Sequence, residues 1–224
     1  MNRFILKHKY LVTFVILAVL AWAAYRRFLV GGSAFITLVV VAAIVWGLGT
    51  FAFIYLWPLV TYTGFKVMIA KGVDANTSSG IPINTLYAVP TLPAPSVSPS
   101  ILTTGTHELL YVVGWLDLSK GSLVLHVPDF SGRYYSIQFS SPLDGSAFAY
   151  VGKRTTGTKA GDYLVTAPNW EGQVPTGVTR ISSPSKSVFI IGRVLVESDS
   201  ELPSAYESAR AIRLTPLSAW NPAH

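Results

Sequence analysis

Two long apolar runs dominate the start of the chain, at residues 10–25 and 28–60. Arg26 and Arg27 separate the two runs. No other charged residue occurs between residues 10 and 60. A bilayer core of roughly 30 Å needs about 20 apolar helical residues, so the second run can cross it and the first nearly can. The pattern predicts a membrane anchor of two transmembrane helices, a helical hairpin, in residues 1–60. A cleaved signal peptide followed by a buried core helix is the alternative.

Residues 61–106 carry a different pattern. An aromatic, lysine-flanked helix end comes first, and this combination fits a membrane–water interface. A stretch rich in proline, serine, threonine and glycine follows at residues 72–106. Because proline interrupts helices and inner strands, we expect an extended tether with one short edge strand near Thr85–Val89. A flexible linker is the alternative interpretation.

From Glu108 onward apolar and polar positions alternate, and β-branched residues are frequent. A period of two predicts half-buried strands, and turn residues separate the segments. The expected strands are Glu108–Leu118, Gly121–Val127, Tyr134–Phe139, Ala147–Val151, Tyr163–Thr166 and Ser187–Val196. Ser204–Ile212 has the pattern of one short amphipathic helix. Residues 107–224 are therefore predicted to be a mainly β domain, an antiparallel, jelly-roll-like β-sandwich with that short C-terminal helix.

The net charge of +6 belongs entirely to the first part of the chain. Residues 1–73 hold seven Lys and Arg and no acid, whereas residues 74–224 hold ten basic and eleven acidic residues, a net charge of −1. The basic excess can therefore meet anionic lipid headgroups, and no basic patch in the β domain indicates nucleic acid. The chain has no Cys, which excludes disulfides, thiol catalysis and cysteine metal sites.

Asp117, Arg133, Arg154 and Arg193 are the candidate site residues of the β domain, because they stand in apolar strand contexts of a sparsely charged region. Charges so placed are rarely buried unless paired. They predict either an internal ion-pair network, which we favour, or a clamp for an anion such as a uronate, since arginine binds carboxylates with two parallel hydrogen bonds.

Other chemistry-bearing patterns are weak. His107 and Glu108 lack the spacing of a zinc helix, and no serine nucleophile motif or phosphate loop occurs. His126 alternates with Leu125 and Val127, so we expect it to face solvent. Six aromatic residues could form a sugar platform, although core packing is the simpler interpretation: Trp115, Tyr134, Tyr135, Tyr150, Tyr163 and Trp170. We predict no catalysis, no cofactor and no metal.

Several ordered motifs in the β domain resemble one known family. They are Trp115–Leu118, Gly132–Gln138, Tyr150–Gly157, Gly161–Leu164, Ala167–Trp170, Ser183–Pro184, Ile191–Arg193 and Leu214–Leu217, after an opening helix that ends in Trp57–Val60. Together they resemble the bacterial family catalogued as domain of unknown function 1254, over roughly residues 51–217.

The resemblance implies an all-β, sandwich-like protein that is mostly exported or membrane-anchored and has no established reaction. Binding of envelope carbohydrate has been suggested for such sandwiches. The family's Asn-rich acidic motif before Tyr111 is altered here, because this chain has Thr106, His107 and Glu108 at those positions. Any ligand site that the motif supported is therefore expected to differ.

The sequence favours a non-catalytic accessory subunit that packs against a larger membrane assembly, for which a photosynthetic or respiratory complex would be one form. Small residues in the second run, Ala42, Ala43, Gly47 and Gly49, would allow close helix packing. The expected partners are the lipid bilayer and other membrane subunits. A periplasmic carbohydrate-binding module or a degenerate enzyme is the alternative, with a glycan as its ligand.

Two observations conflict on the side of the membrane. Five basic residues flank the hairpin and only two lie in its turn, which places the sandwich in the cytoplasm by the positive-inside rule. The resemblance instead implies export. We expect the bacterial inner membrane with the sandwich on the periplasmic side, since related folded domains share a compartment.

Overall fold

The computed structural model describes residues 17–22, 25, 33–72, 80–92 and 106–221. They belong to two compact units, residues 1–57 and 58–224. Residues 17–22 are helical, but most of the first apolar run and the turn after it lie outside the described residues. The predicted hairpin therefore stays a prediction, and so do the anchor and tether boundaries at residues 60 and 106.

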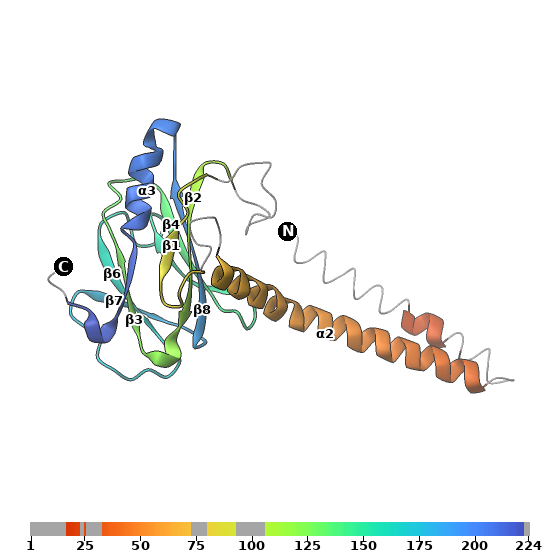
Figure 1. Ribbon diagram of the computed structural model, residues 1–224. Coiled ribbons are helices and arrows are strands. Elements are labelled where there is room, and N and C mark those ends of the chain that lie inside the picture. Colours follow the sequence, from red (N-terminus) through yellow and green to blue (C-terminus); the bar gives the residue numbers. More distant parts are fainter. Residues whose placement is uncertain (1–16, 23–24, 26–32, 73–79, 93–105, 222–224) are drawn as a thin grey trace. The chain divides into compact units, whose positions relative to one another are not determined.

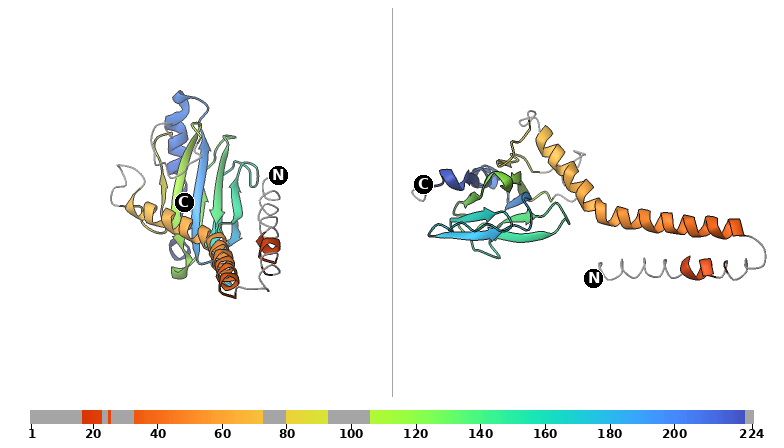
Figure 2. Two further views of the ribbon diagram at one scale, coloured as in Figure 1. Left: turned by 90° about the vertical axis from the view of Figure 1, so that its right-hand side faces the viewer. Right: turned by 90° about the horizontal axis from the view of Figure 1, so that it is seen from below.

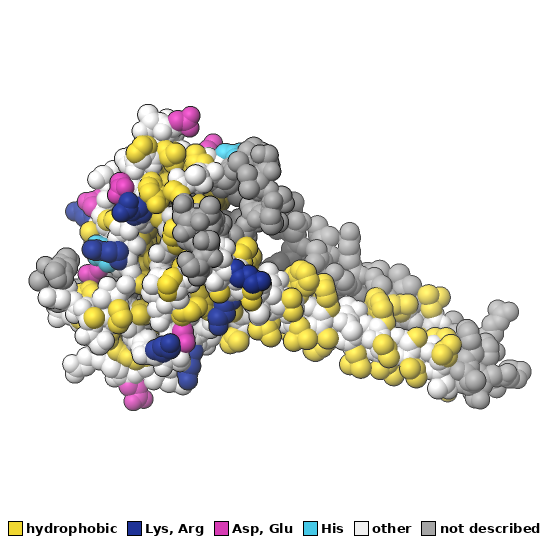
Figure 3. All heavy atoms as spheres, viewed as in Figure 1, with side chains coloured by type: hydrophobic (Ala, Val, Ile, Leu, Met, Phe, Trp, Pro, Cys, Tyr) yellow, Lys and Arg dark blue, Asp and Glu magenta, His cyan; other side chains and the backbone are white. Residues whose placement is uncertain are grey.

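The second apolar run forms one helix, α2, from Ser33 to Lys71. Over Ile36–Lys71 this helix is long and apolar enough to cross a membrane. Its large side chains are exposed, as Val45 (63 %) and Leu48 (64 %) illustrate, and Figure 3 shows hydrophobic side chains along it. A surface of this composition is costly in water, so lipid or protein is expected to cover it.

The second unit is a sandwich of two sheets that face each other (Figure 1). Its strands are β1 (Leu86–Ala88), β2 (Leu109–Asp117), β3 (Leu123–Val127), β4 (Tyr135–Ser140), β5 (Ala147–Gly152), β6 (Gly161–Thr166), β7 (Val178–Ser182), β8 (Ser187–Leu195) and β9 (Arg213–Pro216). The five-stranded sheet has the order β1-β2-β8-β4-β5 and the four-stranded sheet the order β7-β6-β3-β9. The structure confirms the predicted fold class, a mainly antiparallel β-sandwich.

Alternation along the strands builds the main core between the sheets. Leu116 of β2, Leu125 of β3, Ile137 of β4 and Ile190 of β8 are fully buried there. A fully buried aliphatic side chain contributes about 1.5–3 kcal/mol, so this layer supplies much of the folding free energy.

A second apolar cluster covers the outer face of the five-stranded sheet. Trp115 and Phe189 point away from the main core, and Tyr62, Phe65 and Ile69 of α2 pack on that face. The rings of Phe65 and Phe189 are stacked with centroids 5.4 Å apart. The last turns of α2 are therefore part of the domain.

The short helix α3 (Leu202–Arg210) follows β8 after the 3-10 turn Asp199–Glu201. It buries Ala205 and Ala209. The helix contacts β1 and β2, and Figure 2 shows it at the edge of the sandwich where β1 lies. Short 3-10 turns also follow β2 (Leu118–Lys120) and β9 (Leu217–Ala219).

Two strands were not predicted, and both are edge strands of the four-stranded sheet. β7 pairs with β6 in parallel, which departs from the antiparallel pairing expected throughout. β9 contains Pro216, which lacks an amide hydrogen and is tolerated on an edge. The polar composition of both segments hides their strand character, because an edge strand needs little hydrophobic burial.

Candidate functional site

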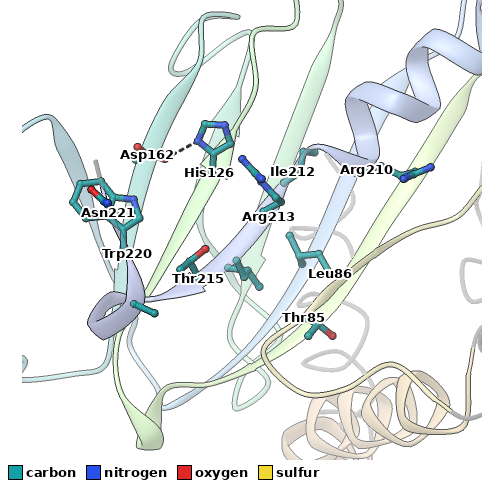
Figure 4. Close-up of a pocket in the computed structure, with 12 residues that line it drawn as sticks. Thr85, Leu86, His126, Asp162, Arg210, Ile212, Arg213, Thr215, Trp220 and Asn221 are labelled. Atoms are coloured by element: carbon teal, nitrogen blue, oxygen red, sulfur yellow. Dashed lines mark hydrogen bonds and ion pairs between the residues drawn. The ribbon is translucent and has the colours of Figure 1, made fainter. Parts of the chain in front are cut away.

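A pocket of about 400 Å³ lies where β1, the end of α3, β3, β6, β9 and the chain after β9 come together (Figure 4). Its walls combine charged, hydroxyl, amide and apolar side chains. The lining residues are Thr85, Leu86, His126, Asp162, Arg210, Ile212, Arg213, Leu214, Thr215, Ala219, Trp220 and Asn221. This volume lies at the small end of the range for small-molecule sites, about 300–1,000 Å³.

His126 and Asp162 are hydrogen-bonded to each other in this pocket. The residues oppose each other in the register of β3 and β6, and the His126 Nδ1 atom lies 2.8 Å from Asp162 Oδ1. The two side chains are 26 % and 24 % exposed, respectively. The prediction that His126 simply faces solvent was therefore incomplete, because alternation gives the face of a strand but not its cross-strand neighbour.

The carboxylate of Asp162 sets the hydrogen-bonding state of His126. An Asp carboxylate is an acceptor, so the Nδ1 atom of the imidazole must carry the hydrogen that it donates. The neutral ring then presents Nε2 as an acceptor, and the protonated ring presents it as a donor. The pair thus fixes the ring orientation and leaves Nε2 for another partner.

Arg213 continues this polar row onto the edge strand. It opposes His126 in the register of β3 and β9, so both side chains project from the same face of the sheet. Figure 4 shows the Arg213 side chain extending toward His126. In the part of the chain that the structure describes, its guanidinium has neither a carboxylate nor a carbonyl partner.

The nearby Arg210 differs, because its Nη1 atom lies 3.3 Å from Glu207 Oε1 and its guanidinium lies over the ring of Tyr206.

Thr85 and Leu86 form another wall of the pocket, and their position depends on how the chain enters β1. The side chain of Asn84, a residue with a φ of 67°, accepts from the Asp117 amide at 2.7 Å and donates to the Asp117 carbonyl at 3.2 Å. On β2, a Cβ atom at Gly114 would lie 2.5 Å from the Thr85 carbonyl oxygen and 2.6 Å from Leu86 Cδ2. The absence of a side chain at this glycine lets β1 approach and line the pocket.

The predicted cluster of one aspartate and three arginines does not form. Asp117 ends β2 opposite Ser187, whereas Arg193 lies opposite Tyr111. Six positions at about 3.3 Å each place the two charged residues about 20 Å apart along the strands. Asp117 instead accepts hydrogen bonds from Ser119, at 2.5 Å from the hydroxyl and 3.0 Å from the amide. These bonds lower the pKa of the Asp117 carboxyl.

The three arginines have separate local partners. Arg133 donates to Glu201 Oε2 at 2.8 Å and to the Leu195 carbonyl at 2.9 Å, which ties the start of β4 to the segment before α3. Arg193 donates to Gln138 Oε1 at 3.4 Å. Arg154 lies over the ring of Tyr134, with its Cζ atom 5.6 Å from the ring centroid. Neither a shared network nor an anion clamp is built from these four residues.

The six aromatic residues do not form a common platform. Trp115, Tyr135 and Tyr163 are buried, and Tyr135 and Tyr163 belong to the main core, whereas Trp115 lies beneath α2. The hydroxyl of Tyr135 donates to the Gly157 carbonyl at 3.1 Å, and burial raises its pKa. Trp170 is occupied by the guanidinium of Arg180, 5.0 Å from its ring centroid. Core packing accounts for three of the six residues, whereas Tyr150 is 47 % exposed.

The predicted helix-packing residues lie in the exposed part of α2. Ala42 and Ala43 are exposed, and a Cβ atom at Gly47 or Gly49 would have no atom within 4 Å. Trp46 lies between these positions on the helical wheel and is 51 % exposed. The small residues therefore form two shallow depressions beside a tryptophan rather than one continuous groove.

A family model described as "Protein of unknown function (DUF1254)" matches residues 83–216, which is more than half of the chain. The chain belongs to this family. The match confirms the resemblance seen in the sequence and includes every strand of the sandwich. No curated protein matches the chain.

One solved structure supports the fold of this DUF1254 member. The VPA0106 protein from Vibrio parahaemolyticus is 24 % identical, with a TM-score of 0.55 over 75 % of this chain. A putative uncharacterized protein from Burkholderia cenocepacia is 13 % identical over 62 % of this chain, with a TM-score of 0.38. The chain spans only 37 % and 36 % of those two chains.

Proposed function

We propose that this DUF1254 protein is a non-catalytic, membrane-anchored accessory subunit that packs through α2 against another membrane protein. The main support for this proposal is that α2 belongs both to the exposed apolar segment and to the core of the β domain. Its first part presents exposed apolar side chains, and its last turns are built into the domain by Phe65 and Ile69. A flexible tether would serve for anchoring alone, whereas a helix shared with the fold suits a domain held in a defined place.

The small residues of α2 supply the proposed contact. Without a hydrophobic driving force between helices in lipid, association depends on close packing at small side chains. Gly47 and Ala43 are one helical turn apart and lie on one side of the helix. A leucine at either position would hold a partner helix away, while lipid contact would tolerate it.

Co-purification from the native membrane in mild detergent tests this proposal. We expect one stoichiometric partner with the wild-type protein and its loss with Gly47→Leu or Ala43→Leu. Val45→Leu is the matched control, because it replaces one bulky exposed residue of the same helix with another. Retention of the partner by both variants, or the absence of any stoichiometric partner, would contradict the proposal. Near-ultraviolet circular dichroism checks that the sandwich stays folded.

We place the sandwich on the periplasmic side of the bacterial inner membrane. The chain has no cysteine, so a single cysteine at the exposed Ser146 reports its side of the membrane. Labelling by an impermeant maleimide in intact spheroplasts is expected. Labelling only after lysis would mean that the basic flanks of the hairpin decide the topology.

The alternative function, a carbohydrate-binding module, would use the pocket at His126 rather than an aromatic platform, since three of those six aromatic residues are buried and the other three do not form a shared surface with them.

A further inference from the structure

The pocket beside β9 contains an exposed arginine, Arg213, that makes neither an ion pair nor a hydrogen bond with any described residue. Arg133 and Arg210 each have a glutamate within 3.3 Å, and Arg180 donates to Thr166 and to the Trp170 carbonyl. Arg213 has no such partner among the described residues, although it projects beside the His126–Asp162 pair. A guanidinium offers planar paired donors, and a carboxylate is the acceptor that matches this geometry.

The charges around the pocket select the charge of the ligand. Arg210 also lines the pocket but is paired with Glu207, so Arg213 and Asp162 are the pocket's remaining charges when His126 is neutral. A monoanion can pair with Arg213 while it stays away from Asp162. A dianion such as phosphate would bring a second negative charge close to the aspartate, and like charges at short distance repel.

The other lining residues indicate which chemical groups the rest of the ligand carries. Leu86, Ile212 and Trp220 offer apolar surface, and Trp220 adds a flat face. Thr85 and Thr215 add hydroxyl groups, and His126 offers Nε2. A molecule that uses all of these groups carries hydroxyls near its carboxylate and an apolar face or ring opposite them.

We propose that this pocket binds a small hydroxylated monocarboxylate, such as a sugar acid or a hydroxy acid. Arg213 receives the carboxylate, His126 Nε2 and Thr215 meet ligand hydroxyls, and Trp220 covers the apolar face. Asp162 acts as a positioning residue that holds the imidazole. The site is independent of the helix contact through α2, so either proposal can fail without the other.

Isothermal titration of the full chain in lipid nanodiscs tests this proposal. The probes are galacturonate, gluconate and lactate, with galactose as the neutral counterpart of the first and inorganic phosphate as the dianion. We expect saturable binding of at least one carboxylate, with galactose and phosphate each weaker by roughly tenfold or more, as the loss of a charge-assisted bidentate pair implies.

Three variants identify the residues responsible. Arg213→Gln should weaken the binding carboxylate at least tenfold, and Asp162→Asn should weaken it less, because the imidazole remains but is no longer held by a charge. Arg154→Gln is the matched control, since this arginine lies over Tyr134 and outside the pocket, and it should leave affinity unchanged.

Four results would overturn the proposal: no saturable binding of any carboxylate, equal affinity for galactose and galacturonate, tighter binding of phosphate, or unchanged affinity in folded Arg213→Gln.

Discussion

Ile69 is the residue through which the role of α2 in the domain can be measured. It lies in the last turns of the helix, is 1 % exposed, and belongs to the cluster that contains Trp115 and Phe189. Its carbonyl also accepts from the Ile81 amide at 2.9 Å, which fixes the chain on its way into β1. Ile69→Ala keeps this backbone bond and removes only the side-chain packing.

The magnitude follows from the atoms removed. Isoleucine loses three carbons on replacement by alanine, and at about 0.8 kcal/mol for each buried carbon the transfer term is about 2.4 kcal/mol. The cavity that remains adds to this, so we expect a loss of about 2.5–4 kcal/mol in the free energy of unfolding. For a domain of this size the melting temperature should fall by about 5–15 °C.

Thermal unfolding of the full chain in detergent, followed by near-ultraviolet circular dichroism, measures the effect. Val67→Ala is the matched control, because Val67 lies on the same helix segment and is 46 % exposed. An exposed substitution of this kind should change stability by less than about 0.5 kcal/mol. Equal melting temperatures for the two variants would show that the helix end does not contribute to the core, and the accessory-subunit proposal would lose its main support.

The other predictions concern the sheet edge, a buried hydroxyl and an ion pair. Gly114→Ala should cost about 1–3 kcal/mol and speed hydrogen exchange in β1, because its Cβ atom would overlap Thr85 and Leu86. Gly64→Ala, with nothing within 4 Å in the helix, should instead stabilise by up to about 1 kcal/mol. Burial raises the pKa of Tyr135, so above about pH 10 the unfolded state holds fewer protons and stability falls as pH rises. Urea midpoints of Tyr135→Phe should therefore fall less steeply over that range, and an unchanged slope would contradict this account. Arg133→Met should lower the free energy of unfolding by about 1–3 kcal/mol through the loss of its bonds to Glu201 and Leu195, measured by urea denaturation, with a smaller loss expected for Arg154→Met.

Most of the sandwich could be predicted from the sequence because inner strands carry their own signal. β2 and β8 are buried on both faces, and the observed bounds are one residue shorter than predicted at both ends of β2 and at the C-terminal end of β8. β7 and β9 escaped prediction because edge strands bury little apolar surface, so their composition resembles that of loops.

The candidate site could be predicted only in part, for a related reason. Alternation shows that His126 faces away from the main core, but the register that brings Asp162 opposite it is set by pairing between distant segments. Arg213 could not be assigned to a sheet because β9 itself was not predicted. The charged cluster was expected because the four residues stand in apolar strand contexts. Local context cannot distinguish four charges that meet from four that each find a local partner, as Asp117 and Arg193 do.

The open edges of the two sheets limit how other proteins can recognise the domain. β1 has three residues and β9 has four, the last of which is Pro216. Short edges present few unpaired backbone groups, and proline removes a donor where a foreign strand would need one. Recruitment of an extended peptide as an added strand is therefore disfavoured at the β1 and β9 edges, and neighbouring copies crowded in one plane gain little from joining their sheets there. Any partner that meets this side of the sandwich must be selected by its side chains, which confer specificity that backbone pairing does not.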